Sequence, residues 1–69
     1  MTYDLNQNGR TLHVLVLHTD GRCALYHLGG PPGPRMLTRR LAAHYLAGWR
    51  WLVRNRPESG YTINRYPLT

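Results

Sequence analysis

Few side chains in this sequence could perform acid–base or nucleophilic chemistry. The three acidic residues are Asp4, Asp20 and Glu58. Asp20 belongs to a turn and Glu58 to a Pro-Gly loop, so no pair of carboxylates is placed for general acid–base catalysis. Asp4 and His13 are expected to face each other across two strands, which could orient an imidazole, but the single serine, Ser59, is distant in the sequence. We therefore expect no catalytic residues and no enzymatic activity.

Metal ligands are also sparse. His18 and the single cysteine, Cys23, are expected to lie opposite each other, which supplies two ligands where a zinc site needs three or four. Cys23 and His27 are separated by about 13 Å along one strand, too far to share one ion. No metal and no other cofactor is therefore expected. One cysteine also excludes an intramolecular disulfide, which fits a reducing cytoplasm.

The composition is strongly basic. Nine arginines and no lysine face three acids, for a net charge of +6. Such a charge suits nucleic acid, and it equally suits an acidic protein surface approached under electrostatic steering. The sequence has no apolar run of the length of a membrane helix, and residues 1–20 lack the pattern of a signal peptide. We expect a cytoplasmic protein without a membrane partner.

Two turn signals divide the N-terminal part into strands. Asn8-Gly9 and Asp20-Gly21 are both strong two-residue hairpin signals. They predict a three-stranded antiparallel meander over residues 2–28, with strands at about 2–6, 10–19 and 22–28. A Gly/Pro connector follows at residues 29–34.

The same turns predict which side chains share a face of the sheet. A two-residue turn at Asp20-Gly21 places Val16 opposite Leu25. One face, expected to form the core, carries Tyr3, Leu5, Leu12, Val14, Val16, Cys23 and Leu25. The opposite face carries Leu15, Leu17, Ala24, Tyr26 and Leu28. Because one helix covers only one face, this second apolar face is expected to form a dimer interface or a second binding surface.

An amphipathic helix is expected over residues 35–55, between Pro34 and Pro57. Its apolar residues fill one half of the helix circumference and its arginines fill the other. Residues 61–66 then alternate as a short strand. The predicted fold is α+β: a three-stranded antiparallel meander, one amphipathic helix packed on one face and a short C-terminal strand, in a single domain over residues 1–69.

The polar half of the helix is the expected partner-binding surface, because tryptophan and arginine are typical of binding hot spots. Its residues are Trp51, Arg39, Arg40, His44, Arg50 and Arg54. The alternative partner is nucleic acid, with the arginines on phosphates and Trp51 stacked on a base. In topology, residues 2–55 resemble the plant AP2-type and integrase arm-binding DNA domains, which read DNA from an exposed sheet face. Here that face is expected to be apolar.

In length, arginine bias, lack of a catalytic set and expected dimer, the chain resembles small early proteins of temperate phages of GC-rich bacteria. Such proteins bind and inhibit host machines. They include anti-CRISPR proteins and anti-activators of quorum-sensing regulators and pilus motors. The resemblance implies a non-enzymatic inhibitor or modulator of a host bacterial protein, such as a transcription regulator or a pilus or CRISPR machine. The expected partners are this host protein, through an acidic surface, and a second copy of the chain.

Overall fold

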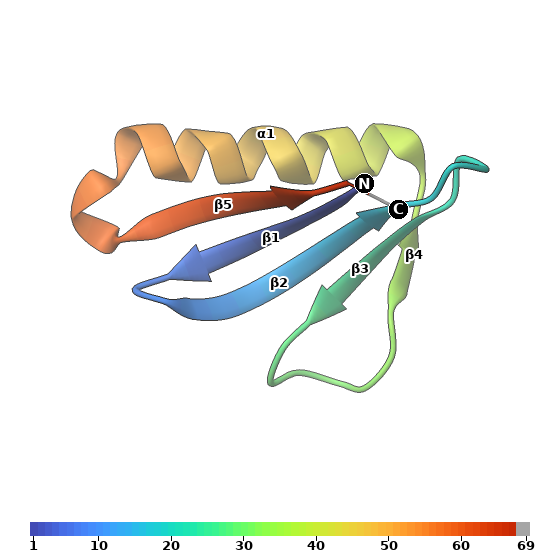
Figure 1. The fold of residues 1–69 in the computed structure, drawn as a ribbon, viewed down its shortest axis with the longest axis horizontal. Helices are drawn as coiled ribbons and strands as arrows, with labels where there is room; N and C mark the ends of the chain where they lie inside the picture. Colours follow the sequence, from blue (N-terminus) through green and yellow to red (C-terminus); the bar gives the residue numbers. More distant parts are fainter. Residues whose placement is uncertain (68–69) are drawn as a thin grey trace.

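One antiparallel sheet, one α-helix and a short 3-10 helix account for the regular structure of residues 1–67, the part of the chain that this computed structural model describes (Figure 1). The strands are β1 (Thr2–Gln7), β2 (Arg10–Leu17), β3 (Cys23–His27), β4 (Arg35–Leu37) and β5 (Tyr61–Tyr66). Their order across the sheet is β4-β3-β2-β1-β5. Helix α1 (Arg39–Asn55) crosses one face to connect β4 with β5, the two strands at the edges. The predicted α+β fold is confirmed.

The predicted C-terminal strand is also confirmed, and it extends the sheet. After α1, a short 3-10 helix, η1 (Pro57–Ser59), and a left-handed Gly60 reverse the chain, and β5 then pairs with β1. The β1–β2 turn docks on this reversal, because the backbone N–H of Asn8 donates to the carbonyl oxygen of Gly60 at 3.1 Å. The start of the edge strand β5 is therefore fixed against the β1–β2 turn.

The helix begins later than predicted. Residues 35–37 form β4, which pairs with β3, so the expected start at residue 35 is wrong. Thr38 is the N-cap, and its hydroxyl accepts a hydrogen bond from the Leu41 N–H at 3.2 Å. Threonine at this position satisfies one of the unpaired N–H groups at a helix start. The extended segment before it buries Leu37 against the core. Within residues 1–67, no helix is both long and apolar enough to span a membrane.

The β1–β2 hairpin forms at the predicted turn but shifts register within the strands. Asn8 and Gly9 both have positive φ, as the favoured two-residue hairpin turn requires. Between Leu5 and Asn6 the ladder slips by one residue, so that Leu5 pairs with His13 and Asn6 pairs with Thr11. Such a β-bulge reverses the faces of the strand beyond it.

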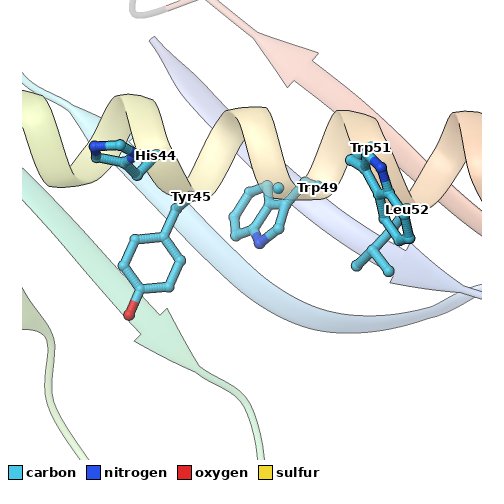
Figure 2. Close-up of a pocket in the computed structure, with 6 residues that line it drawn as sticks. His44, Tyr45, Trp49, Trp51 and Leu52 are labelled. Carbon is cyan, nitrogen blue, oxygen red and sulfur yellow. The ribbon is translucent and has the colours of Figure 1, made fainter.

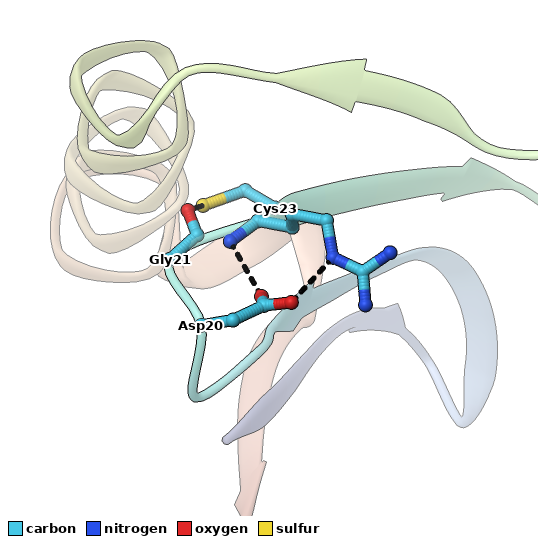
Figure 3. A network of polar contacts seen from close by, with 4 residues as sticks. Asp20, Gly21 and Cys23 are labelled. Atoms are coloured by element: carbon cyan, nitrogen blue, oxygen red, sulfur yellow. Dashed lines mark hydrogen bonds and ion pairs between the residues drawn. The ribbon is translucent and has the colours of Figure 1, made fainter.

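The β2–β3 hairpin uses a three-residue loop rather than the predicted two-residue turn. The N–H of His18 donates to the carbonyl oxygen of Arg22 at 2.8 Å, and Gly21, with φ at 93°, takes the left-handed position. Asp20 fastens the loop by accepting from the backbone N–H of Arg22 at 3.1 Å and from its Nε at 2.7 Å (Figure 3). These bonds, the backbone one first, lower the pKa of the Asp20 carboxyl. The loop shifts the β2–β3 register by one residue.

The two shifts together turn β2 over. Leu15 and Leu17 pair with Leu25 and Cys23 and face α1, and Leu15 is 0% exposed. Val14 and Val16 instead face away from the helix. The predicted faces of β1 and β3 are correct, because the two one-residue shifts cancel between those strands, but the predicted face of β2 is wrong.

The core lies between this inner face and α1. Its buried members are Leu5, Leu15, Cys23, Leu25, Leu37, Ala42, Leu46 and Trp49. The face of the sheet opposite α1, which we call the open sheet face, has no covering element within residues 1–67.

Candidate protein-binding surface

The apolar half of α1 is wider than the part that the sheet covers. Ala42, Leu46 and Trp49 are buried, but Leu41 is 44% exposed and Gly48 is exposed. At about 100° per residue, these two residues lie on the flank of the helix that continues toward Trp51. The helix thus presents uncovered apolar surface along one side.

A shallow groove of about 420 Å³, the helix groove, runs along this flank (Figure 2). Its lining residues are His44, Tyr45, Gly48, Trp49, Trp51 and Leu52. Tyr45 and Trp49 point from α1 toward the sheet and form the inner side of the groove. Gly48 leaves space, because a Cβ added there would meet no atom within 4 Å. The groove can therefore accept an apolar side chain.

Trp51 separates the helix groove from a second groove of about 330 Å³ on the polar side of α1, the basic groove. The basic groove is lined by Ala47, Arg50, Trp51, Arg54 and Asn55. Trp51 is 52% exposed, and the guanidinium carbon of Arg56 lies 5.8 Å from the centre of its ring. A tryptophan placed between apolar and cationic surface can bury its ring against a partner while the arginines meet negative charge.

The helix arginines have no carboxylate partner within residues 1–67. Helix α1 contains four arginines and no acidic residue. In the described part of the chain, the one ion pair joins Arg22 to Asp20 on the β2–β3 loop. Uncompensated guanidinium groups along one helix create a positive field that attracts an anionic surface.

The predicted helix residues are divided between two sites. His44, Arg50, Arg54 and Trp51 line the two grooves. Arg40 is exposed but precedes Trp51 by eleven residues, or about 16 Å along the helix axis.

Arg39 turns away from this surface toward the β2–β3 loop. A Cβ added at Gly21 would lie 2.7 Å from the Nη2 atom of Arg39, so the guanidinium lies directly over that glycine. It lines a separate pocket of about 330 Å³ together with His18 and Cys23. Arg39 is therefore not part of the surface around Trp51.

The predicted second interface is divided by the turning of β2. Leu15 and Leu17 belong to the core side, whereas Ala24 and Tyr26 are on the open sheet face. Leu28 lies just beyond β3 and is 54% exposed. The expectation that all five residues share one face is wrong, because the three-residue loop shifts the register.

The residue pairs considered for chemistry are also separated. Asp4 pairs with Val14, and His13 pairs with Leu5, so Asp4 and His13 lie on opposite faces of the sheet. Cys23 is buried and pairs with Leu17 rather than with His18. Among the described residues, no group of three or more potential ligands could hold a metal ion.

One arrangement of aromatic rings was not foreseen from the sequence. His13 stacks on Trp49 with ring centres 6.2 Å apart, and His27 meets His13 edge-on at 4.6 Å. The Nδ1 atom of His13 is buried without a hydrogen-bond partner within residues 1–67. Burial, and secondarily the charge of His27, lowers the pKa of His13. His13 therefore packs against Trp49, which lines the helix groove, whereas the predicted register places His13 on the opposite face of the sheet.

The function of the two grooves has to be inferred from their own geometry. No family model, curated protein or solved structure matches the chain.

Proposed function

We propose that the protein is a non-enzymatic binding module whose helix face docks on an acidic surface of another protein. The observation that carries this proposal is the half-exposed Trp51 between the helix groove and the basic groove. A partner with an apolar side chain flanked by carboxylates would fill the first groove and neutralise the second.

The composition of this surface favours strong binding by a few residues. Tryptophan and arginine dominate binding hot spots, and truncating such a residue typically costs about 2 kcal/mol or more, which is about 30-fold in Kd. Trp51 has the exposed area to act as the anchor. Arg50 and Arg54 lie within one turn of it and would contribute to the association rate as well as to affinity.

Nucleic acid is the second candidate, because an exposed tryptophan beside unpaired arginines could stack on a base and hold phosphates. The helix groove favours the protein partner. Its lining is apolar, with His44 as the one titratable side chain at its rim apart from Tyr45. The basic residues near Trp51 are confined to one end of α1, and Arg40 is about 16 Å away. A phosphate backbone would use the arginines but leave the helix groove empty.

Capture from a nuclease-treated bacterial lysate by the immobilised full chain tests the proposal. Wild type should retain a protein, and Trp51→Ala and the double variant Arg50→Glu/Arg54→Glu should reduce its retention at least about tenfold. Arg10→Glu is the matched control, because Arg10 is an exposed arginine of β2 that lines neither groove of α1. The proposal fails if no protein is retained, or if Arg10→Glu reduces retention as much as the helix variants do.

Titration with a random DNA duplex distinguishes a nucleic-acid partner from a protein partner. Phosphate contacts by Arg40, Arg50, Arg54 and Arg56 would make the logarithm of the association constant fall against the logarithm of the salt concentration with a slope of about −3 to −4. Retention of a protein from the nuclease-treated lysate, together with the absence of salt-dependent duplex binding, would support the protein partner. Steep salt-dependent duplex binding that is lost with Arg50→Glu/Arg54→Glu would instead support nucleic acid.

A further inference from the structure

The open sheet face carries an apolar patch on the side opposite the partner-binding helix. The patch spans three adjacent strands, β2, β3 and β4, and we call it the sheet patch. Its residues are Val14, Val16, Tyr26 and Met36, with Ala24 buried between Val16 and Met36. Tyr26 is exposed, and Met36 is 57% exposed although it lies in the ladder beside Ala24. A contiguous apolar patch on the second face of a two-layer fold is unusual unless something covers it.

The charge distribution indicates which partner can cover it. The chain has a net charge of +6, so a second copy is repelled wherever arginines would meet. Across the open sheet face, Asp4 is the charged residue within the strands, and Arg22 at its margin is ion-paired with Asp20. This face is close to neutral, whereas the helix face is strongly positive. A second copy can therefore approach here without the repulsion that opposes other orientations.

One polar network of the open sheet face is already hydrogen-bonded internally and can lie at the edge of an interface. Asn6 is buried, and its side chain donates to Asp4 Oδ1 at 2.8 Å and accepts from the Thr11 hydroxyl at 2.6 Å. Covering this network would leave few polar groups without partners. It supplies a polar rim beside the sheet patch, as is typical of protein interfaces.

The area of the face is close to the minimum that a weak dimer needs. Five strands spaced about 4.8 Å apart, with an average length of about 20 Å, give a flat area of roughly 450 Å² before side chains are counted. Two such faces together give about 900 Å² of flat area, close to the lower limit of about 1,000 Å² for a specific interface.

From the patch, the charge distribution and the area, we propose that two copies of the chain stack their open sheet faces about a two-fold axis. The dimer has four layers, with the two sheets about 10 Å apart and a helix on each outer side. Twofold stacking places the sheet patch of one copy on that of the other, so apolar surface meets apolar surface. The two helix faces remain free for their acidic partner.

Sedimentation equilibrium of the full chain over micromolar to millimolar concentrations tests the dimer. Wild type should show a concentration-dependent doubling of mass. Tyr26→Glu and Met36→Glu, each made separately, should raise the dimer dissociation constant at least about tenfold, because each buries a pair of like charges. Leu41→Glu is the matched control, since Leu41 is a similarly exposed apolar residue on the helix. Circular dichroism establishes that each variant is folded, and Tyr26→Phe should preserve the dimer.

Three results would overturn the proposal. The first is a wild-type chain that stays monomeric at millimolar concentration. The second is a dimer that Leu41→Glu disrupts and Tyr26→Glu does not, which would place the contact on the helix. The third is a monomer whose capture of a lysate protein is lost with Tyr26→Glu, which would assign the face to a foreign protein. Trp51→Ala should leave the dimer intact, so the dimer and the proposed function can fail independently.

Discussion

Replacing a single leucine on β2 tests the register on which the description of both faces depends. Leu15 is 0% exposed beneath α1, and Leu28, just beyond β3, is 54% exposed. Leu15→Ala should therefore remove a full set of core contacts and leave a cavity, at a cost of about 3 kcal/mol, within the usual range of about 2–5 kcal/mol for buried leucines. Leu28→Ala, the same chemical change at an exposed site, should cost less than about 0.5 kcal/mol.

The loss expected for Leu15→Ala, compared with the total free energy of unfolding, decides which assay can measure it. A chain of 69 residues is expected to have a free energy of unfolding of roughly 3–10 kcal/mol. A loss of about 3 kcal/mol should lower Tm by about 12–24 °C, as followed by far-UV circular dichroism. If Leu15→Ala is unfolded at room temperature, Leu15→Val, which costs about 1 kcal/mol, keeps the comparison measurable by urea denaturation.

The outcome distinguishes the two registers directly. With the two-residue turn first expected at Asp20-Gly21, Leu15 and Leu28 would share the outer face and their alanine variants would have similar stability. A difference between Leu15→Ala and Leu28→Ala of less than about 1 kcal/mol would refute the three-residue loop and the position of β2 that follows from it.

Two further predictions concern titration and backbone conformation. Because burial lowers the pKa of His13 in the fold, the unfolded chain binds the proton first as the pH falls, so the free energy of unfolding should be fully retained above about pH 6.5 and decrease below it. Urea midpoints against pH should lose this dependence in His13→Phe and keep it in His44→Phe; equal profiles for both variants would contradict the assignment. Gly21→Ala should destabilise the protein by about 1 kcal/mol, because φ at Gly21 is 93°, and Gly48→Ala should stabilise it by about 0.5–1 kcal/mol, because Gly48 is helical and unobstructed. Thermal unfolding that shifts in the same direction for both glycine variants would show this backbone argument to be wrong.

The elements of the fold were predictable because local signals and burial agree. The Asn8-Gly9 pair predicts a two-residue hairpin turn, and both residues have the positive φ that this turn requires. Pro57 follows the end of α1 at Asn55, as expected. The start of α1 was missed although Thr38 carries an N-cap signal, because Pro34 offered an equally valid start and the pairing of Arg35–Leu37 with β3 is a long-range effect. Pairing between distant segments cannot be read from local preferences.

The register of β2 was not predictable because both of its faces are apolar. Leu15 and Leu17 alternate with Val14 and Val16, so hydrophobicity does not distinguish the two orientations. The choice depends on a β-bulge and on the conformation of one loop, each of which changes the register by a single residue. The resulting sheet places the larger leucines in the core and the valines on the open sheet face.

The helix residues of the candidate site were predictable from the sequence, but the grooves beside them were not. Trp51, Arg50 and Arg54 lie on the polar half of the helix by angle alone, and that position does not depend on the sheet. The helix groove does depend on the sheet, because it exists only where the apolar half of α1 extends beyond the strands beneath it. The helix angle alone therefore identifies Trp51, Arg50 and Arg54, and tertiary packing determines the shape of the grooves beside them.

The opposite positions of the two proposed surfaces have a consequence for binding strength. If the open sheet faces stack, the two helix faces point in opposite directions and their axes lie about 30 Å apart across the four layers. One dimer then cannot place both Trp51 side chains on a single flat surface. It can bridge two partner molecules, or enter between two acidic surfaces of one symmetric partner, where the second contact becomes intramolecular and the combined affinity can exceed either single affinity by about 10²–10⁴-fold. A weak dimer and a small hot spot would then suffice for tight binding to a symmetric target, and Tyr26→Glu would weaken such binding without touching the surface around Trp51.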